Sequence, residues 1–265
     1  MTPFRIAVVV VILAIAGIAA YWFWPFTQPP VLPPSKPPLV APPAPAPAEV
    51  PPQGPQNPIP QAETPQPQPL PTVKESDPAM RDAISGVVGK DAFERWFVPE
   101  RIVHRIVATI DNLPRKNYAQ RLSPVKPPSG LFQVTGKDDD LAIAPANAER
   151  YTPYVRALDA IDTAKLVAVY THFYPLFQKA YVELGYPNGY FNDRLVEVID
   201  NLLAAPEVKG PVKLVVPHVL YEYADPALQQ RSAGQKLLIR MGPVNAAKVK
   251  AKLREIRAKV AKARP

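Results

Sequence analysis

The sequence contains no cysteine, and this absence removes several kinds of chemistry at once. Disulfide bonds, thiolate metal sites and a cysteine nucleophile are all excluded. The only histidines are His104, His172 and His218, and none of them lies in an H-E-x-x-H pattern or another ligand pair. Because a nucleotide-binding glycine motif is also missing, the sequence predicts neither a metal nor a cofactor.

Residues 6–24 carry no charge and read IAVVVVILAIAGIAAYWFW. This run matches the roughly 20 apolar residues that a helix needs to cross a bilayer. Arg5 precedes the run and the next charge is Lys36, so we expect a single-pass cytoplasmic (inner) membrane protein with residues 1–5 inside and the C-terminal domain periplasmic. A cleaved signal peptide, with a mature chain beginning near Ala20, is the alternative.

Proline is abundant, and more than half of the 37 prolines lie between Pro25 and Pro78. Because this segment has few large apolar residues to offset its ordering entropy, we expect residues 25–77 to be a disordered proline-rich linker. In the extended polyproline form it would hold a folded domain on the order of 100 Å from the membrane. Its PxxP patterns, such as residues 30–33, leave a docking strip as the alternative to a spacer.

The remaining residues, 78–265, are enough for one globular domain, and their periodicity predicts a mainly α fold with minor β. A helix is expected from Asp77-Pro78 onward, with Asp77 as its cap and Pro78 in its first position. Further helices are expected over residues 100–113, 163–184, 193–205 and 226–241, and from about residue 245. Short strands are predicted at residues 131–134 and 141–143, which form a hairpin, and on either side of Pro217 within residues 212–223.

The stretch from Phe173 to Leu195 combines seven aromatic rings with two glycines. The rings recur at three- and four-residue spacing, which indicates a buried helix face more than a ligand-binding box. We expect a Schellman ending with Gly185 at positive φ and Tyr186 in apolar contact, and Asp162, Asn188 and Asn192 as candidate helix caps. Two polar residues beside apolar faces, Gln178 and Gln235, link helices or line a pocket. The residues that would line such a pocket are Tyr186, Tyr190, Asn192 and Arg240.

Several long phrases of this part resemble a known bacterial family. They are YPLFQKAYVELGYP, FNDRLVEVIDNLLAAP, YEYADPALQQRSAGQKLLIRMGPVNAAKVKAKL and the earlier VATIDNLPR. On these residues the chain resembles the family called domain of unknown function 3014. The resemblance implies a membrane anchor, a proline-rich spacer and a helical C-terminal domain. It implies no activity and no catalytic residues.

Few residues form patterns that carry chemistry. Asp193, Glu197 and Asp200 share one helix face, where carboxylates serve acid/base catalysis, hold a hard cation or form a solvated stripe. Ser123 and Lys126 match S-x-x-K, but the prolines around them prevent the helix that this motif requires. The acidic stripe therefore leaves a cell-wall or other envelope hydrolase as the alternative function.

The formal net charge of +8 is concentrated in the last helix, where Lys250, Arg254 and Arg257 are expected on the outer face. Such a helix suits an anionic envelope polymer or an acidic protein, whereas the expected topology disfavours nucleic acid. The alternative is an amphipathic helix docked by a stripe of Val249, Leu253, Ile256 and Val260. The sequence thus favours a membrane-anchored binding or scaffolding protein of the envelope over an enzyme.

Overall fold

The computed structural model describes residues 54–59 and 69–261, which belong to one compact unit, Pro51–Pro265. This part of the chain is a mainly helical domain with a little β structure, as predicted. The predicted membrane span at residues 6–24 and most of the predicted linker at residues 25–77 lie outside the described residues. Within the described ranges, no helix is long and apolar enough to cross a membrane.

Helix α7 (Thr163–Glu183) contributes its buried aromatic face to the largest hydrophobic cluster. Its first turn is capped as predicted, because the carboxylate of Asp162 accepts hydrogen bonds from the backbone N–H groups of Ala164 and Lys165 at 2.7 and 3.0 Å. The aromatic face packs against α4 (Ile102–Asn112). Helix α4 fully buries the apolar side chains Ile102, Val103 and Val107.

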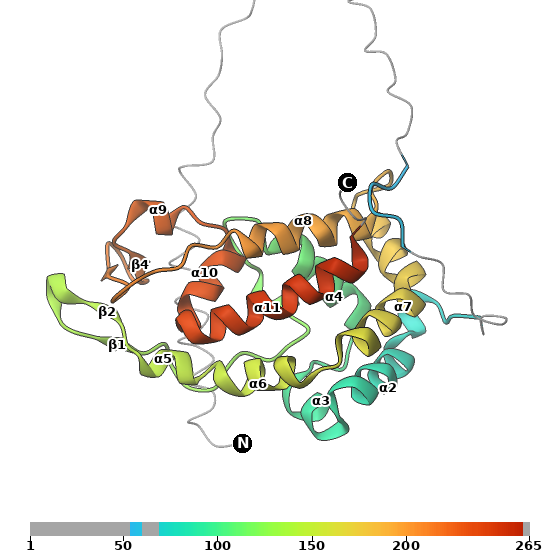
Figure 1. The fold of residues 1–265 in the computed structure, drawn as a ribbon, viewed down its shortest axis with the longest axis horizontal. Coiled ribbons are helices and arrows are strands. Elements are labelled where there is room, and N and C mark those ends of the chain that lie inside the picture. The colour runs from blue at the N-terminus through green and yellow to red at the C-terminus, as the bar shows by residue number, and fades with distance from the viewer. Residues whose placement is uncertain (1–53, 60–68, 262–265) are drawn as a thin grey trace, which may run out of the picture. The chain divides into compact units, whose positions relative to one another are not determined.

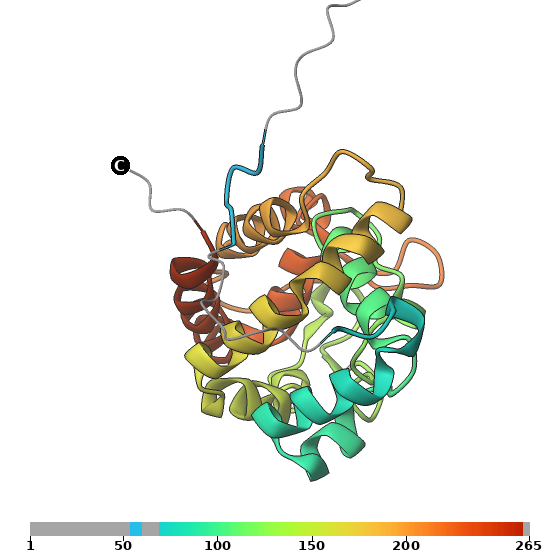
Figure 2. The same cartoon turned by 90° about the vertical axis from the view of Figure 1, so that its right-hand side faces the viewer.

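Helices α2 (Asp77–Val88) and α3 (Lys90–Trp96) pack together beside α4 and α7, and Figure 2 shows them below α7. The sequence predicts that Asp77 caps α2, but this prediction is wrong. The carboxylate of Asp77 instead accepts hydrogen bonds from the N–H groups of Arg101 and Ile102, at 2.7 and 2.8 Å. It therefore caps α4, whose first N–H groups have no partner within their own helix.

Helices α8 (Phe191–Leu203) and α11 (Gly242–Val260) lie side by side, as Figure 1 shows, and enclose a second apolar cluster. This cluster contains the predicted docking residues Leu253, Ile256 and Val260. Helix α6 (Thr152–Ala160) also packs against α11, and the short α5 (Ala146–Glu149) precedes it. Three of the four residues of the predicted docking stripe are thus confirmed, while Val249 is not part of this cluster, and α11 begins at Gly242 rather than near residue 245.

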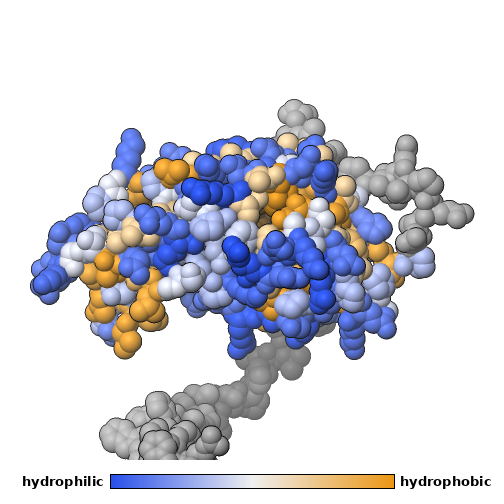
Figure 3. All heavy atoms as spheres, turned by 90° about the horizontal axis from the view of Figure 1, so that it is seen from below, coloured by the Kyte–Doolittle hydropathy of each residue, from blue (hydrophilic) through white to orange (hydrophobic). Residues whose placement is uncertain are grey.

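Two small two-stranded sheets lie together at one end of the domain, on the left of Figure 1. Strand β1 (Val134–Thr135) pairs with β2 (Ala142–Ile143), and β3 (Leu214–Val215) pairs with β4 (Glu222–Tyr223), both antiparallel. The predicted hairpin and the predicted pair of extended segments are therefore confirmed, with shorter strands. Figure 3 shows apolar surface at this end and also toward the middle and the opposite end of the same face, among hydrophilic residues. The described residues also include three 3-10 helices, namely η2 (Val73–Glu75), η3 (Gln120–Leu122) and η4 (Asp138–Asp140).

The prediction of one continuous helix over residues 226–241 is wrong. The structure breaks it into α9 (Pro226–Gln229) and α10 (Ala233–Arg240). Ser232 has an extended backbone between them, and its hydroxyl accepts a hydrogen bond from the N–H of Gln235 at 3.2 Å. Because this is the geometry of an N-cap, Ser232 starts a new helix instead of continuing the previous one.

Candidate functional site

The corner between α7 and α8 has the predicted Schellman geometry. Gly185 has φ of 114°, and its N–H donates to the carbonyl of Val182 at 3.0 Å. The N–H of Tyr186 donates to the carbonyl of Tyr181 at 3.4 Å, and the rings of these two tyrosines stack with centroids 4.5 Å apart. Both hydrogen bonds and the apolar contact of the motif are therefore present.

Gln178 holds the other side of the corner. Its side-chain oxygen accepts a hydrogen bond from the N–H of Phe191 at 2.8 Å, and its amide nitrogen donates to the carbonyl of Gly189 at 2.7 Å. Gln178 thus links two helices, as predicted. The N-cap of α8 is Tyr190, and it makes no side-chain cap. The prediction that Asn188 or Asn192 caps α8 is therefore wrong, because Gln178 satisfies the first N–H from outside the helix.

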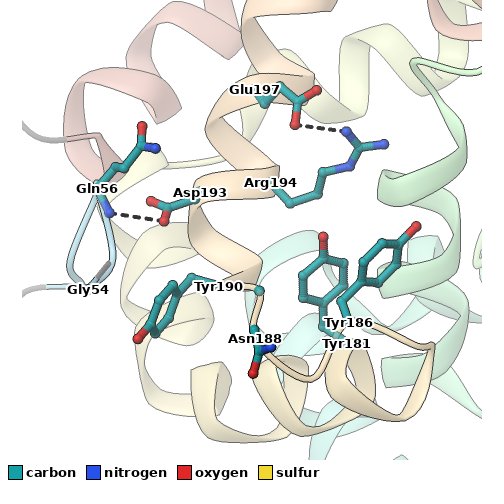
Figure 4. Close-up of a pocket in the computed structure, with 10 residues that line it drawn as sticks. Gly54, Gln56, Tyr181, Tyr186, Asn188, Tyr190, Asp193, Arg194 and Glu197 are labelled. Carbon is teal, nitrogen blue, oxygen red and sulfur yellow. Dashed lines mark hydrogen bonds and ion pairs between the residues drawn. The ribbon is translucent and has the colours of Figure 1, made fainter. Parts of the chain in front are cut away.

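A groove of about 500 Å³ crosses the first turns of α8. Figure 4 shows Tyr181 and Tyr186 on one side of Arg194, and Asp193 with Tyr190 on the other. Two residues from far earlier in the chain, Gly54 and Gln56, complete the lining beside Asp193. The full set of lining residues also includes Asn188, Gly189 and Glu197.

Residues 54–59, which we call the strap, are held to α8 by hydrogen bonds. The carboxylate of Asp193 accepts from the backbone N–H groups of Gln56 and Asn57 at 3.0 and 2.7 Å, and from the side-chain amide of Asn57 at 3.1 Å. The amide of Asn192 donates to the carbonyl of Asn57 at 2.8 Å. Part of the predicted linker therefore lies against the domain.

A network of charges lies behind the groove. Arg194 donates to Glu197 at 2.8 Å and to the carboxylate of Asp111 at 3.1 Å, and the side chain of Asp111 is only 3% exposed. Asp111 also accepts from Arg115 at 2.5 Å and from the hydroxyl of Tyr186 at 3.2 Å. Burial alone would lower the pKa of Arg194, but hydrogen bonding and attraction to the two carboxylates raise it. Arg194 is therefore a fixed cation.

The structure brings together only some of the predicted site residues. Tyr186 and Tyr190 line the groove with Asp193 and Glu197, while Asn192 is buried beside it and binds the strap. Arg240 lies elsewhere, with its guanidinium 5.8 Å from the ring of Phe132. The remaining predicted residues, Asp200, Lys250, Arg254 and Arg257, do not line the groove.

The expected outer face of the last helix needs a correction. Lys250 is only 6% exposed, and its ammonium donates to the carbonyl of Ala205 at 2.6 Å, so the prediction that it faces outward is wrong. Arg257 pairs with Asp200 at 2.5 Å, whereas Arg254 is exposed. An amphipathic pattern cannot distinguish a lysine that faces solvent from one whose long chain reaches a buried carbonyl.

The structure also bears on two other sequence patterns, the S-x-x-K match at Ser123 and Lys126 and the possible metal ligands. The hydroxyl of Ser123 donates to the carbonyl of Val125 at 2.6 Å, and Lys126 donates to the carbonyl of Glu94 at 2.9 Å. These groups therefore satisfy separate backbone carbonyls instead of forming a nucleophile and base. Among the described residues, no three acidic or histidine side chains are grouped so as to hold a metal ion.

Sequence reasoning missed Asp111, Arg194 and the strap. Arg194 directly follows Asp193 on a helix with an apolar face. A charged side chain in such a position indicates an oppositely charged partner inside the domain. The strap has a weaker signal, because Gln56 and Asn57 stand between two prolines inside a segment with few large apolar residues.

The fold and the groove define a small, mainly helical domain with an open polar and aromatic site at a helix corner. The family described as protein of unknown function (DUF3014) matches residues 102–257. The chain belongs to this family, as its resemblance indicates, and the match contains the groove except for the strap residues. A comparison with curated proteins and another with solved structures each found no match.

Proposed function

We propose that this protein is a membrane-anchored binding module of the bacterial envelope, and that the groove over α8 binds a segment of polypeptide. One observation carries the proposal. Asp193 accepts hydrogen bonds from two consecutive backbone N–H groups at a bend of the strap, so the rim of the groove already holds a polypeptide main chain.

The chemistry of the groove supports a neutral or basic peptide. Tyr181, Tyr186 and Tyr190 supply flat rings with polar ends, a combination that contributes large contact areas in recognition sites. The charged lining residues are two carboxylates, Asp193 and Glu197, and one guanidinium. Because the carboxylates outnumber the guanidinium, the groove does not suit a polyanion.

The arrangement favours binding over hydrolysis. General acid/base catalysis needs a carboxylate within reach of the substrate's proton. Each member of the acidic stripe already has a partner: Asp193 binds the strap, Glu197 binds Arg194, and Asp200 binds Arg257. The hydrolase alternative thus lacks a carboxylate that is directed only at the groove.

Location at the membrane rests on the sequence. The uncharged run at residues 6–24 has the length of a membrane span and ends in an aromatic belt, and the proline-rich residues that follow suit a spacer. A tethered domain with an open groove fits the capture of a partner in the envelope. This topology would be overturned by a reporter after Pro265 that is active in the cytoplasm.

Site-specific photo-crosslinking in intact cells tests the proposal. A photoreactive amino acid at Asn188, which is exposed in the groove, should capture a polypeptide, and Glu197→Gln or Tyr190→Ala should lower the yield. The matched control is the same amino acid at Arg254, which is exposed on the basic helix α11. Capture at Arg254 but not at Asn188 would move the binding site to α11, and the proposal for the groove would be lost.

A further inference from the structure

The geometry points to a second role for the strap, as a detachable wall of the groove. Binding of a ligand in the groove and docking of the strap on α8 then stabilise each other. This inference rests on the proposed function. It adds that the linker is part of the binding site and that binding shortens the tether. The occupant of the docking surface is the chain's own segment, residues 54–59.

The sequence of the strap suits it to this contact. Within Pro55-Gln56-Asn57-Pro58 only two backbone N–H groups exist, because proline has none. Both of them donate to Asp193. Asn57 contributes a further donor through its side chain and an acceptor through its carbonyl, which Asn192 binds. The two prolines also restrict the backbone of the segment, which reduces the entropy that docking costs.

The surface that receives the strap is held in place by the domain itself. Asn192 is 1% exposed, and besides binding the strap it donates to the carbonyl of Val260 at 2.8 Å. Its side-chain oxygen accepts a hydrogen bond from the hydroxyl of Tyr170 at 3.0 Å. Because these partners belong to α7 and α11, the amide keeps its orientation when the strap leaves. A preorganised site of this kind lowers the cost of docking.

The strap also forms part of the groove. Gly54 and Gln56 line it on the side of Asp193, while Tyr181 and Tyr186 line the other side, as Figure 4 shows. A ligand in the groove therefore touches both the domain and the strap, and it binds more weakly when the strap is absent. By thermodynamic linkage, the ligand must favour docking of the strap by the same factor.

Docking changes the reach of the tether. Leu70 and Val73 pack against the main core, so the domain holds the chain from this point onward. Release of the strap moves the first point at which the domain holds the chain from the strap to Leu70, and an extended polyproline segment of this length would span at most on the order of 50 Å. Occupancy of the groove would thus draw the domain toward the membrane.

Amide hydrogen exchange on the detergent-solubilised full chain tests the docking. The N–H groups of Gln56 and Asn57 should exchange slowly, and Asp193→Ala should accelerate both by about tenfold or more, since both lose a charge-assisted hydrogen bond. Asp200→Ala, on the same helix but paired with Arg257, should leave these two rates unchanged. Fast exchange in the unmodified protein would overturn the inference.

Asn57→Pro tests the coupling without changing a residue of α8, because it removes both the backbone donor and the side-chain donor of Asn57 to Asp193. Photo-crosslinking from Asn188 should fall several-fold in this variant, because the groove loses its wall. An unchanged crosslinking yield would refute the coupling and leave the proposed function intact. Protected strap amides without any captured polypeptide would instead refute the proposed function, while the strap would still be docked. A photo-crosslinker at Gln56 that joins two differently tagged chains would show that a second copy supplies the strap, and this would overturn the assignment within one chain.

Discussion

Arg194 on α8 and Asp111 on α4 bind each other across the domain. Nε of Arg194 lies 3.1 Å from the Asp111 carboxylate, and a terminal nitrogen donates to the Asp111 backbone carbonyl at 2.8 Å. This pair joins the end of α4 to the first turns of α8, directly behind the groove. The same guanidinium binds Glu197 in the groove, so the groove and the core share one cation.

Removing this cation should destabilise the fold. Arg194→Met leaves the buried carboxylate of Asp111 with Arg115 as its remaining cation, and breaking a buried pair from one side costs roughly 3–5 kcal/mol. We expect the free energy of unfolding, measured in urea, to fall by about 3 kcal/mol, near the lower end of this range. Glu197→Gln is the control, since Glu197 is 64% exposed and its loss should change stability by less than about 0.5 kcal/mol. Equal effects of both substitutions would contradict the buried role of the pair.

Gly185 allows a test of backbone conformation alone. A Cβ at Gly185 would meet no atom within 4 Å, but the residue has φ of 114°. Gly185→Ala should therefore cost about 1 kcal/mol or more. Gly86 in α2 has equally open space and no positive φ, so Gly86→Ala should stabilise the protein by roughly 0.5–1 kcal/mol. Thermal unfolding of both variants should show shifts of opposite sign, and the same sign for both would refute this explanation.

Substitutions at two of the basic residues of α11, Lys250 and Arg254, should have contrasting effects on stability. Lys250→Met leaves the buried carbonyl of Ala205 without its hydrogen bond, which should cost about 1–3 kcal/mol. Arg254→Met changes an exposed side chain and should alter stability by no more than about 0.5 kcal/mol. Chemical denaturation measures both. A neutral Lys250→Met would show that its ammonium is hydrated and not bound to Ala205.

Acid should weaken the start of α7. Backbone hydrogen bonds from Lys165 and Ala164 hold the pKa of Asp162 below its ordinary value, and hydrogen bonds from Thr163 and Lys252 do the same for the pKa of Glu255. A lowered folded-state pKa gives stability that is present above the unfolded-state pKa, about 4 for both residue types, and is lost as pH falls through the folded value. The Tm should hence be level above about pH 5 and fall below it.

Asp162→Asn separates capping from titration. Asparagine caps a helix about as well as aspartate but carries no titratable group. The variant should therefore lose less Tm than the unmodified protein between about pH 5 and pH 3. Parallel Tm curves for the two proteins over this interval would show that the Asp162 carboxylate contributes nothing to the acid sensitivity.

Local signals in the sequence predicted much of the fold. Asp162 and Gly185 act within one helical turn of their own positions, so the neighbouring residues are enough to identify their roles. Asp77 shows the limit of this reasoning. Its position before a proline predicts a cap for its own helix, but its carboxylate binds α4, which begins well beyond it in the chain. Tertiary contact therefore decided which helix it caps.

The groove could be predicted only in part. Tyr186 and Tyr190 are close in sequence to the corner that they line, and the aromatic spacing points to them. Gln56 reaches the same groove from a segment 137 residues before Asp193. No periodicity connects these two positions, because the strap contributes backbone groups and not an apolar face. Lys250 was misplaced for a related reason, since its partner is a backbone carbonyl on another element.

The position of Asn57 decides where mechanical load enters the domain. Tension applied from the N-terminal side of the chain reaches Asp193 and Asn192 before it reaches Leu70 and Val73 in the core. Those first contacts are a small number of hydrogen bonds, so they rupture at lower force than packed helices. The strap then releases slack, and the tension on the chain falls before any helix is pulled. Single-molecule stretching should record this release as a small extension that precedes unfolding.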